Sequence, residues 1–137
     1  MRERKEIIKV GLAAFVDRKL VLVRKKGNRA FILPGGKPES GESHLDALIR
    51  EVEEELGCSI QSPIYHGRFA DKAAELRNTD VVVLLYCGKL VGQPMPRSEI
   101  EEIALVDVIG SANVVIAPSI KNHILPYLRT LITSPAK

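Results

Sequence analysis

The chain has 137 residues, of which 45% are hydrophobic and 27% are charged, and its formal net charge is +3 at pH 7. That length corresponds to one domain, and the composition is that of a globular chain, which excludes a disordered or fibrous protein. The longest uninterrupted apolar run covers residues 81–87. This is too short to cross a bilayer, so no membrane partner is expected.

The N-terminal residues contain no apolar stretch followed by a small-residue cleavage site, so the sequence shows no secretory signal. The chain has two cysteines, Cys58 and Cys87, and both are flanked by apolar residues. Two such cysteines form neither a disulfide framework nor a zinc site. These features favour the cytoplasm as the location.

The first half of the chain begins with two aliphatic segments, residues 7–16 and 20–24, which predict a hairpin around a polar triplet. A short strand is predicted over 30–33. The next segment, residues 34–38, contains two prolines and two glycines and predicts a loop. A helix is predicted over 43–56.

The second half of the chain predicts strands over 60–70, 80–90 and 103–108, followed by a C-terminal helix. The apolar residues of that helix fall on one face; they are Ile120, Ile124, Leu128, Leu131 and Ile132. Pro126 lies within the pattern and is expected to kink or split the helix. Strands mixed with two well-separated helices predict an α/β or α+β fold, in which helices pack on a mixed sheet.

The helix over 43–56 has clear boundaries. Ser43 and Asp46 have the spacing of a capping box, and Gly57 can end the helix in a left-handed conformation. The apolar residues expected on the core face are Leu45, Leu48, Ile49, Val52 and Leu56. A second stripe carries three carboxylates at spacing i, i+3, i+4, namely Glu51, Glu54 and Glu55. Asp46 and Glu53 lie on the other flank.

The acidic residues are concentrated around this helix. Residues 39–55 contain seven acids and one base, so this segment carries −6 and the rest of the chain +9. An acidic patch on a basic body could hold divalent cations next to a polyanion, but it could equally be a solvated helix face. The residues before the helix favour the cation. Gly35 and Gly36 allow a close approach of the backbone to a ligand, and Ala47 leaves space beside the carboxylates.

Residues 36–58 resemble the Nudix box, which reads Gly, five residues, Glu, seven residues, Arg-Glu, a bulky aliphatic, any residue, Glu-Glu, any residue, Gly, a bulky aliphatic. The fixed positions are matched by Gly36, Glu42, Arg50, Glu51, Val52, Glu54, Glu55 and Gly57. Cys58 replaces the final aliphatic residue, which is a mild departure because a buried cysteine behaves as a small hydrophobe. Residues 31–36 also resemble the usual lead-in to the box.

The resemblance implies that residues 1–137 form a single Nudix hydrolase domain, an α/β/α sandwich with a mixed β-sheet. It implies hydrolysis of a pyrophosphate bond in a nucleoside diphosphate linked to another group. The box would form a loop–helix–loop that holds Mg²⁺ or Mn²⁺. By position, the metal ligands would be Gly36, through its carbonyl, and Glu51, Glu54 and Glu55. Arg50 would orient the glutamates, and Glu42 would support the loop.

Several roles around the site are hypotheses. Glu51 and Glu54, with Arg50, are assigned to catalysis, and the general base is left open because family members differ. Three acids beyond the box are candidates for an additional base: Glu99, Glu101 and Glu102. The residues expected to contact the substrate are Lys37, Arg24, Arg29 and Phe31, of which the basic side chains could meet phosphates. One or two aromatic rings are expected at the pocket, where a base could stack.

The substrate is the least determined feature. The small size and the absence of subfamily marks favour a MutT-like pyrophosphatase, which converts a nucleoside triphosphate, oxidised or non-canonical, to monophosphate and pyrophosphate. The alternatives are hydrolysis of ADP-ribose, a dinucleoside polyphosphate or capped RNA, and a non-catalytic nucleotide-sensing module. The expected partner is a small nucleotide. No stable nucleic-acid partner is expected, since no RNA-binding motif or basic tail is visible, and a homodimer is left open.

Overall fold

A computed structural model of the chain describes residues 3–110 and 112–133, so the first two and last four residues of the predicted domain lie outside it. The first sheet contains β1 (Lys5–Ala13), β4 (Gly35–Gly36), β5 (Ser59–Lys72) and β6 (Thr79–Val91), in the order β4-β1-β6-β5. The second contains β2 (Phe15–Val16), β3 (Lys19–Lys25) and β7 (Ile100–Val106), in the order β2-β3-β7. The helical elements are α1 (His44–Leu56), the π-helical turn η1 (Ile120–Ile124) and α2 (Leu125–Thr133).

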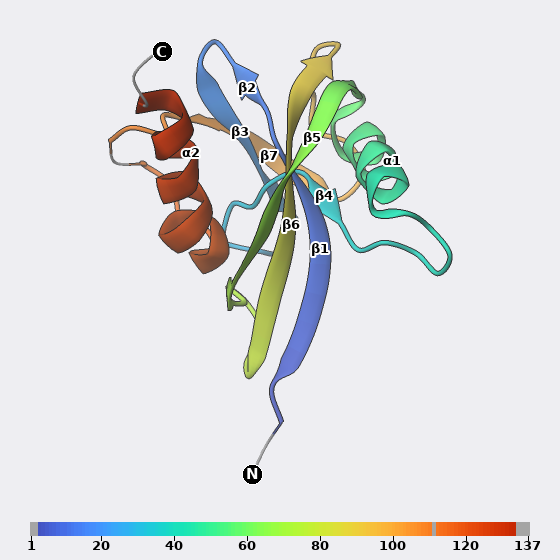
Figure 1. The fold of residues 1–137 in the computed structure, drawn as a ribbon, viewed down its shortest axis with the longest axis vertical. Coiled ribbons are helices and arrows are strands. Elements are labelled where there is room, and N and C mark those ends of the chain that lie inside the picture. Colours follow the sequence, from blue (N-terminus) through green and yellow to red (C-terminus); the bar gives the residue numbers. More distant parts are fainter. Residues whose placement is uncertain (1–2, 111, 134–137) are drawn as a thin grey trace.

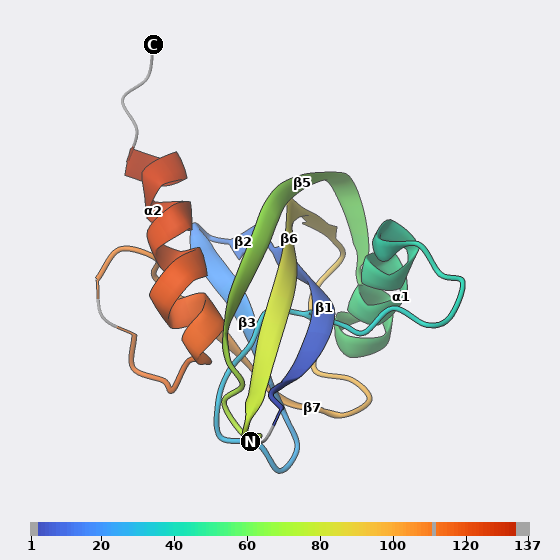
Figure 2. The ribbon, with the colours of Figure 1, turned by 60° about the horizontal axis from the view of Figure 1, so that its bottom comes forward.

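The first sheet is mixed, as predicted. β1 and β6 run parallel over nine residue pairs, from Lys5 opposite Thr79 to Ala13 opposite Cys87. β4 and β5 pair antiparallel with their neighbours. Helices α1 and α2 lie on opposite sides of the strands, and both views show this (Figures 1 and 2). The predicted α/β/α arrangement is confirmed.

Two hydrophobic cores fill the space between the strands and the helices. Alternate residues of β6 point to each: Val82 and Leu84 join the core beside α1, and Val83 and Leu85 join the core beside α2. We call these the α1-side core and the α2-side core. Strands buried on both faces read as continuous apolar runs in the sequence, which is the pattern of residues 81–87.

The predicted N-terminal hairpin is correct only in part. β2 and β3 form it, and its two turn residues, Asp17 and Arg18, both have positive φ, as a tight two-residue hairpin loop requires. The strand predicted over 7–16 is divided at Ala14, however, and β1 belongs to the other sheet. The carbonyl of Ala14 accepts a hydrogen bond from the Val21 N–H. The interruption lets one continuous segment serve two sheets.

The segment before α1 also differs from its prediction. The two glycines are not loop but the short strand β4, which pairs with Val10 and Gly11 of β1. A side chain at Gly35 is excluded, because its Cβ would lie 1.9 Å from the Val10 carbonyl oxygen. The strand expected over 30–33 is reduced to two isolated bridges, from Ile32 to Val23 and from Phe31 to Ile116.

The C-terminal helix is split, as predicted. The turn η1 ends where the Leu125 N–H donates to the Ile120 carbonyl, and α2 follows. Pro126 has no N–H to donate to the carbonyl four residues earlier, so an ordinary helical bond is missing at this junction. Among the described residues, no helix is long and apolar enough to cross a membrane.

Candidate active site

Helix α1 has the predicted boundaries. The Ser43 hydroxyl accepts a hydrogen bond from the Asp46 N–H at 3.0 Å, and Gly57 ends the helix with φ 70°. The buried face of the helix, however, is rotated from its prediction. Leu45 and Ile49 are exposed, whereas Glu55 is buried with Leu48 and Val52. The rotation turns the predicted carboxylate stripe toward β4.

Glu55 is the most deeply buried carboxylate at this face, with 1% of its surface exposed. Its Oε1 accepts a hydrogen bond from the Gly35 N–H at 3.0 Å. Its Oε2 is buried and has no hydrogen-bond partner among the described residues. Burial raises the pKa of Glu55 to about 7, and the Gly35 hydrogen bond opposes this shift. A buried unpaired oxygen is costly, and this one is available to a ligand.

Arg50 connects the other carboxylates of the predicted box. It holds Glu42 through two hydrogen bonds, Nε to Oε2 at 2.8 Å and Nη2 to Oε1 at 2.9 Å. Its Nη1 lies 2.9 Å from Glu51 Oε2 and 3.5 Å from Glu54 Oε1. The same guanidinium donates to the Lys37 carbonyl at 3.3 Å. Arg50 is therefore placed to orient Glu51 and to tie the preceding loop to the helix.

Hydrogen bonding with Arg50 has a marked effect on Glu42. Together with the bond that Glu42 Oε1 accepts from the Glu39 N–H, it lowers the pKa of Glu42 to about 2. The pKa of Arg50 is raised by the same contacts. Both groups therefore stay charged across the physiological range, and this pairing holds the loop closed by charge-assisted hydrogen bonds.

The predicted metal ligands are near one another but do not close around a common point. No cluster of three or more His, Cys, Asp or Glu side chains suited to a metal occurs in residues 3–110 and 112–133. Glu51 and Glu54 turn to Arg50, and Glu55 turns to Gly35. Two observations nevertheless fit a hard cation. The first is the buried, unpaired oxygen of Glu55. The second is the close approach of Glu51 to Gly36: a Cβ added to Gly36 would lie only 2.6 Å from Cδ of the Glu51 carboxylate.

A cavity of about 360 Å³ opens beside Glu51. Gly36 and Glu51 of the predicted box line it. The other charged residues in its lining are Lys9, Lys25, Lys37, Glu75 and Glu99. Lys25 comes from the end of β3, and its Nζ lies 3.1 Å from Glu99 Oε1. The cavity therefore joins part of the predicted box to three cationic side chains from separate parts of the chain.

Lys9 is a lining residue that was not predicted from the sequence. It has no hydrogen bond or salt bridge within the described residues, and burial and the nearby Lys25 lower its pKa. A signal was present, because Lys9 is the only charged residue between Ile7 and Val16. A lysine in an apolar strand is unfavourable unless a partner of opposite charge is available. That partner could be a substrate.

The cavity contains only some of the residues predicted to serve it. Lys37 lines it, and so does Glu99 among the three candidate bases. Arg24 is placed elsewhere: its Nη2 lies 3.1 Å from Glu102 Oε1, and its guanidinium carbon lies 5.8 Å from the centre of the Phe31 ring.

The other predicted side chains are also away from the cavity lining. Phe31 is buried in the α2-side core, and Glu101 is exposed on β7. Arg29 is exposed, and its backbone N–H donates to the Glu75 carboxylate at 3.4 Å. This bond links the turn after β3 to the loop between β5 and β6.

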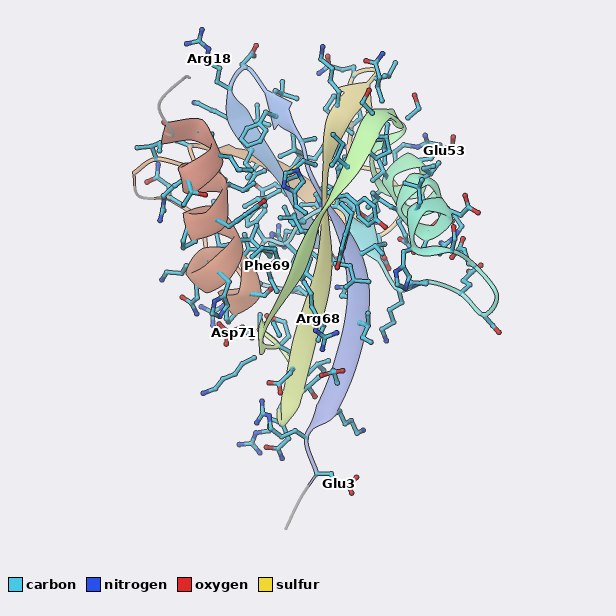
Figure 3. All side chains as sticks on the ribbon, in the orientation of Figure 1. Glu3, Arg18, Glu53, Arg68, Phe69 and Asp71 are labelled. Atoms are coloured by element: carbon cyan, nitrogen blue, oxygen red, sulfur yellow. The ribbon has the colours of Figure 1, made fainter. Side chains whose placement is uncertain are left out.

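One or two aromatic rings were expected at the cavity, but none of the described residues that line it is aromatic. Phe69 of β5 points toward α2 (Figure 3), where its ring lies 5.3 Å from that of Tyr127. Tyr65 pairs with Tyr86 at the same centroid separation. These rings pair with one another between neighbouring elements.

The NUDIX domain model matches residues 6–115 of this chain. The chain therefore belongs to the Nudix family, whose members are hydrolases that act on phosphoric anhydrides in nucleoside diphosphate-linked substrates. Nudix hydrolases generally use divalent metals. The predicted family and enzyme class are confirmed.

Individual relatives agree with this assignment. YvcI, an uncharacterised Nudix hydrolase of Bacillus subtilis (strain 168), is 31% identical over 115 residues, which cover 82% of this chain and 72% of that protein. The mRNA-decapping enzyme subunit 2 of Saccharomyces cerevisiae (strain YJM789) is 25% identical over 108 residues, or 78% of this chain and 11% of that protein. The crystal structure of a MutT protein from Methanosarcina mazei Go1 has a TM-score of 0.77 at 21% identity, covering 98% of this chain and 100% of that one, which shows a shared fold.

Proposed function

We propose that this chain is a divalent-metal-dependent pyrophosphohydrolase that converts a nucleoside triphosphate to monophosphate and pyrophosphate in the cytoplasm. The observation that carries the proposal is the cavity in which Gly36 and Glu51 meet Lys9, Lys25 and Lys37. A triphosphate carries several negative charges on a short chain, and three lysines around one cavity suit such a group.

The residues that would hold Mg²⁺ or Mn²⁺ are the Gly36 carbonyl and the carboxylates of Glu51, Glu54 and Glu55. When bound, a divalent cation neutralises phosphate oxygens and lowers the pKa of a bound water. Glu54 is half exposed beside Arg50, so its carboxylate can move without leaving a core position. Arg50 keeps Glu51 aligned, and the loop that carries Lys37 stays attached to the helix through Glu42.

The other lining residues have complementary roles in this proposal. The three lysines bind and orient the phosphate chain. Glu99 is the candidate base that the fold brings to the cavity, where its carboxylate could accept a proton from the attacking water. Its contact with Lys25 Nζ at 3.1 Å would hold that carboxylate in place.

The test is product analysis after incubation with Mg²⁺ or Mn²⁺, with a chelator control. The panel contains canonical and oxidised nucleoside triphosphates, ADP-ribose, dinucleoside polyphosphates, nucleotide sugars and capped RNA. We expect chelator-sensitive release of monophosphate and pyrophosphate from a triphosphate. Cleavage of a diphosphate-linked compound alone would overturn the substrate assignment. Nucleotide binding without turnover on any compound would favour the sensing module.

Helix α1 offers a matched pair of variants for the site. Glu54→Gln is expected to lower kcat/KM by about 100-fold or more, since metal assistance contributes several kcal/mol to such reactions. Glu53→Gln changes the neighbouring residue, which lies on the outer side of the helix (Figure 3), and should leave activity near wild type. Circular dichroism verifies that both variants fold. Equal activity of the two variants would contradict the assigned role of Glu54.

A further inference from the structure

The connection between β6 and β7 passes beside helix α1 (Figure 2). We call residues 92–99 of this connection the strap. The Met95 N–H of the strap donates a hydrogen bond to the Leu56 carbonyl at 3.1 Å. The Arg97 N–H donates to the Glu55 carbonyl at 3.0 Å. The last carbonyls of a helix have no partner within the helix, so the strap completes the C-terminal end of α1.

The side chain of Arg97 lies against Gly57, the residue that ends α1. A Cβ added to Gly57 would lie 2.7 Å from Arg97 Nη1 and 3.1 Å from its Cδ. The last turn of α1 contains no basic residue. A cation at this end of a helix is favourable, because the partial charge of the helix dipole there is negative. The guanidinium of Arg97 therefore supplies from the strap a charge that the helix itself lacks, and Gly57 leaves room for it.

The strap ends in a tight turn that carries Glu99. The Ile100 N–H donates to the Arg97 carbonyl at 3.0 Å, so Arg97 and Glu99 belong to one four-residue turn. Ser98, the second residue of this turn, has φ 56°, a conformation that glycine usually takes at such a position. A residue other than glycine keeps this conformation only where its neighbours fix it. On the far side of the turn, the Glu99 carbonyl accepts a hydrogen bond from the Lys26 N–H at 2.9 Å.

We propose that Arg97 is a positioning residue, which lies against Gly57, fixes the turn at the end of the strap and thereby holds Glu99 at the cavity. This inference rests on the proposed function, because it requires Glu99 to act as the base. A base must lie within hydrogen-bond reach of the water whose proton it accepts. The contacts with Lys25 and Lys26 attach Glu99 to the end of β3, whereas the strap sets its place relative to the carboxylates of α1.

Arg97 itself is not among the described residues that line the cavity, so its effect on the reaction passes through Glu99. It is exposed, and its replacement removes no core packing. We expect Arg97→Ala to lower kcat about 10-fold and to change KM by less than about twofold. A misplacement of about 1 Å can cost up to about 100-fold in rate, whereas the lysines proposed to bind the phosphates are left in place.

Two further variants of the strap sharpen this comparison. Arg97→Lys should restore most of the lost kcat, because its stem and charge can occupy the same position against Gly57. Met95→Ala is the matched control, since Met95 meets α1 through its backbone N–H while its side chain is exposed. It should keep kcat near wild type. Circular dichroism verifies that each variant folds. A wild-type kcat in Arg97→Ala, or an equal loss in Met95→Ala, would overturn the proposal.

A double-mutant cycle shows whether Arg97 acts through Glu99. Glu99→Gln should lower kcat by about 100-fold or more, as expected for the loss of a general base. Adding Arg97→Ala to Glu99→Gln should lower kcat no further, because residues that act as a unit have non-additive effects. The cycle is measured on whichever compound of the nucleotide panel the protein cleaves. A second full 10-fold loss in the double variant would overturn the proposal, and so would wild-type turnover by Glu99→Gln.

Hydrogen exchange followed by mass spectrometry separates this inference from the proposed function, because it needs no substrate. Amides of residues 92–100 should exchange faster in Arg97→Ala than in the wild type or in Met95→Ala, while those of α2 stay unchanged. Faster exchange without turnover on any compound would support the anchoring by Arg97 and overturn the proposed function. Turnover of a triphosphate with unchanged exchange in Arg97→Ala would support the function and overturn the anchoring. Unchanged exchange without turnover would overturn both.

Discussion

Gly35 and Gly36 are adjacent in the chain, yet a side chain at each would meet a different obstacle. At Gly35 the Cβ would lie 1.9 Å from the backbone oxygen of Val10, and the residue has φ 148°. At Gly36 the nearest atoms belong to the carboxylate end of Glu51, at 2.6 to 2.8 Å. Backbone cannot move aside without disrupting the sheet, whereas the end of a flexible side chain can.

We therefore predict opposite outcomes for two alanine variants. Gly36→Ala should fold with stability close to wild type but lose most activity, because Glu51 must leave its position beside Arg50. Gly35→Ala should lower the free energy of unfolding strongly, since it forces both a backbone clash and a rare φ. Urea unfolding and kcat/KM measured on each variant check this pair. A stable and fully active Gly36→Ala protein would contradict the role given to the Gly36–Glu51 contact.

Single residues of the site differed in how well they could be predicted. Glu51, Glu54 and Glu55 could be proposed from the sequence because their spacing is regular along one helix. The contribution of Lys9 was missed, because it depends on which strand of the fold lies beside the box. Arg24 and Phe31 lie close to the box in sequence but not at the cavity. Arg24, near the end of β3, pairs with Glu102. Phe31 is buried in the α2-side core.

At the scale of elements, α1 and the loop before it behave as one unit. The loop is held by Glu42, which bonds to Arg50 of the helix and to the Glu39 N–H. The helix is held by Glu55, which bonds to β4. The helix boundaries followed from local capping chemistry. The rotation of the helix could not be predicted in the same way, because the hydrogen bond between Glu55 and Gly35 competes with the burial of Leu45 and Ile49.

The pairing of Glu42 with Arg50 predicts a pH dependence of stability. The pKa of Glu42 is about 2 in the folded protein, below its ordinary value near 4.5. Its stabilising contribution is therefore complete above about pH 4.5 and is lost as the pH falls toward 2. We expect Glu42→Gln to be less stable than wild type near neutral pH, and the difference to shrink between pH 4.5 and 2.

Urea unfolding at several pH values measures this difference. Glu39→Gln serves as the control, because Glu39 is exposed and its Oε1 lies 3.9 Å from Arg50 Nε, beyond a good hydrogen bond. Its effect should be smaller at every pH. A Glu42→Gln difference that stays constant down to pH 2 would show that the ion pair does not account for it.

At the scale of the whole molecule, the two cores share their strands. β1, β3 and β6 each contribute alternate residues to the α1-side core and the α2-side core. A loss of packing in either core should therefore weaken the same sheet and the same cooperative transition. This arrangement also fixes the site, since Lys9 and Glu51 reach one cavity only when β1 and α1 are both in place.

We predict that Leu48→Ala in the α1-side core and Leu128→Ala in the α2-side core each lower the free energy of unfolding by about 2–5 kcal/mol. Both should leave a single transition in urea followed by circular dichroism. Leu131→Ala, at an exposed position of α2, should change stability by less than about 0.5 kcal/mol. Two separate transitions in either core variant would show that the cores unfold independently.

The sequence by itself determined the family, the boundaries of α1, the long strands and the carboxylates of the box. These features depend on contacts within a few residues or on a fixed spacing along one helix. Only the tertiary structure decided that the glycine pair forms a strand, that β1 and β2 belong to different sheets, and that Lys9, Lys25 and Glu99 share a cavity with Glu51. Such features depend on which distant segments pair, and the free energy of that pairing is set by the whole core rather than by any local pattern.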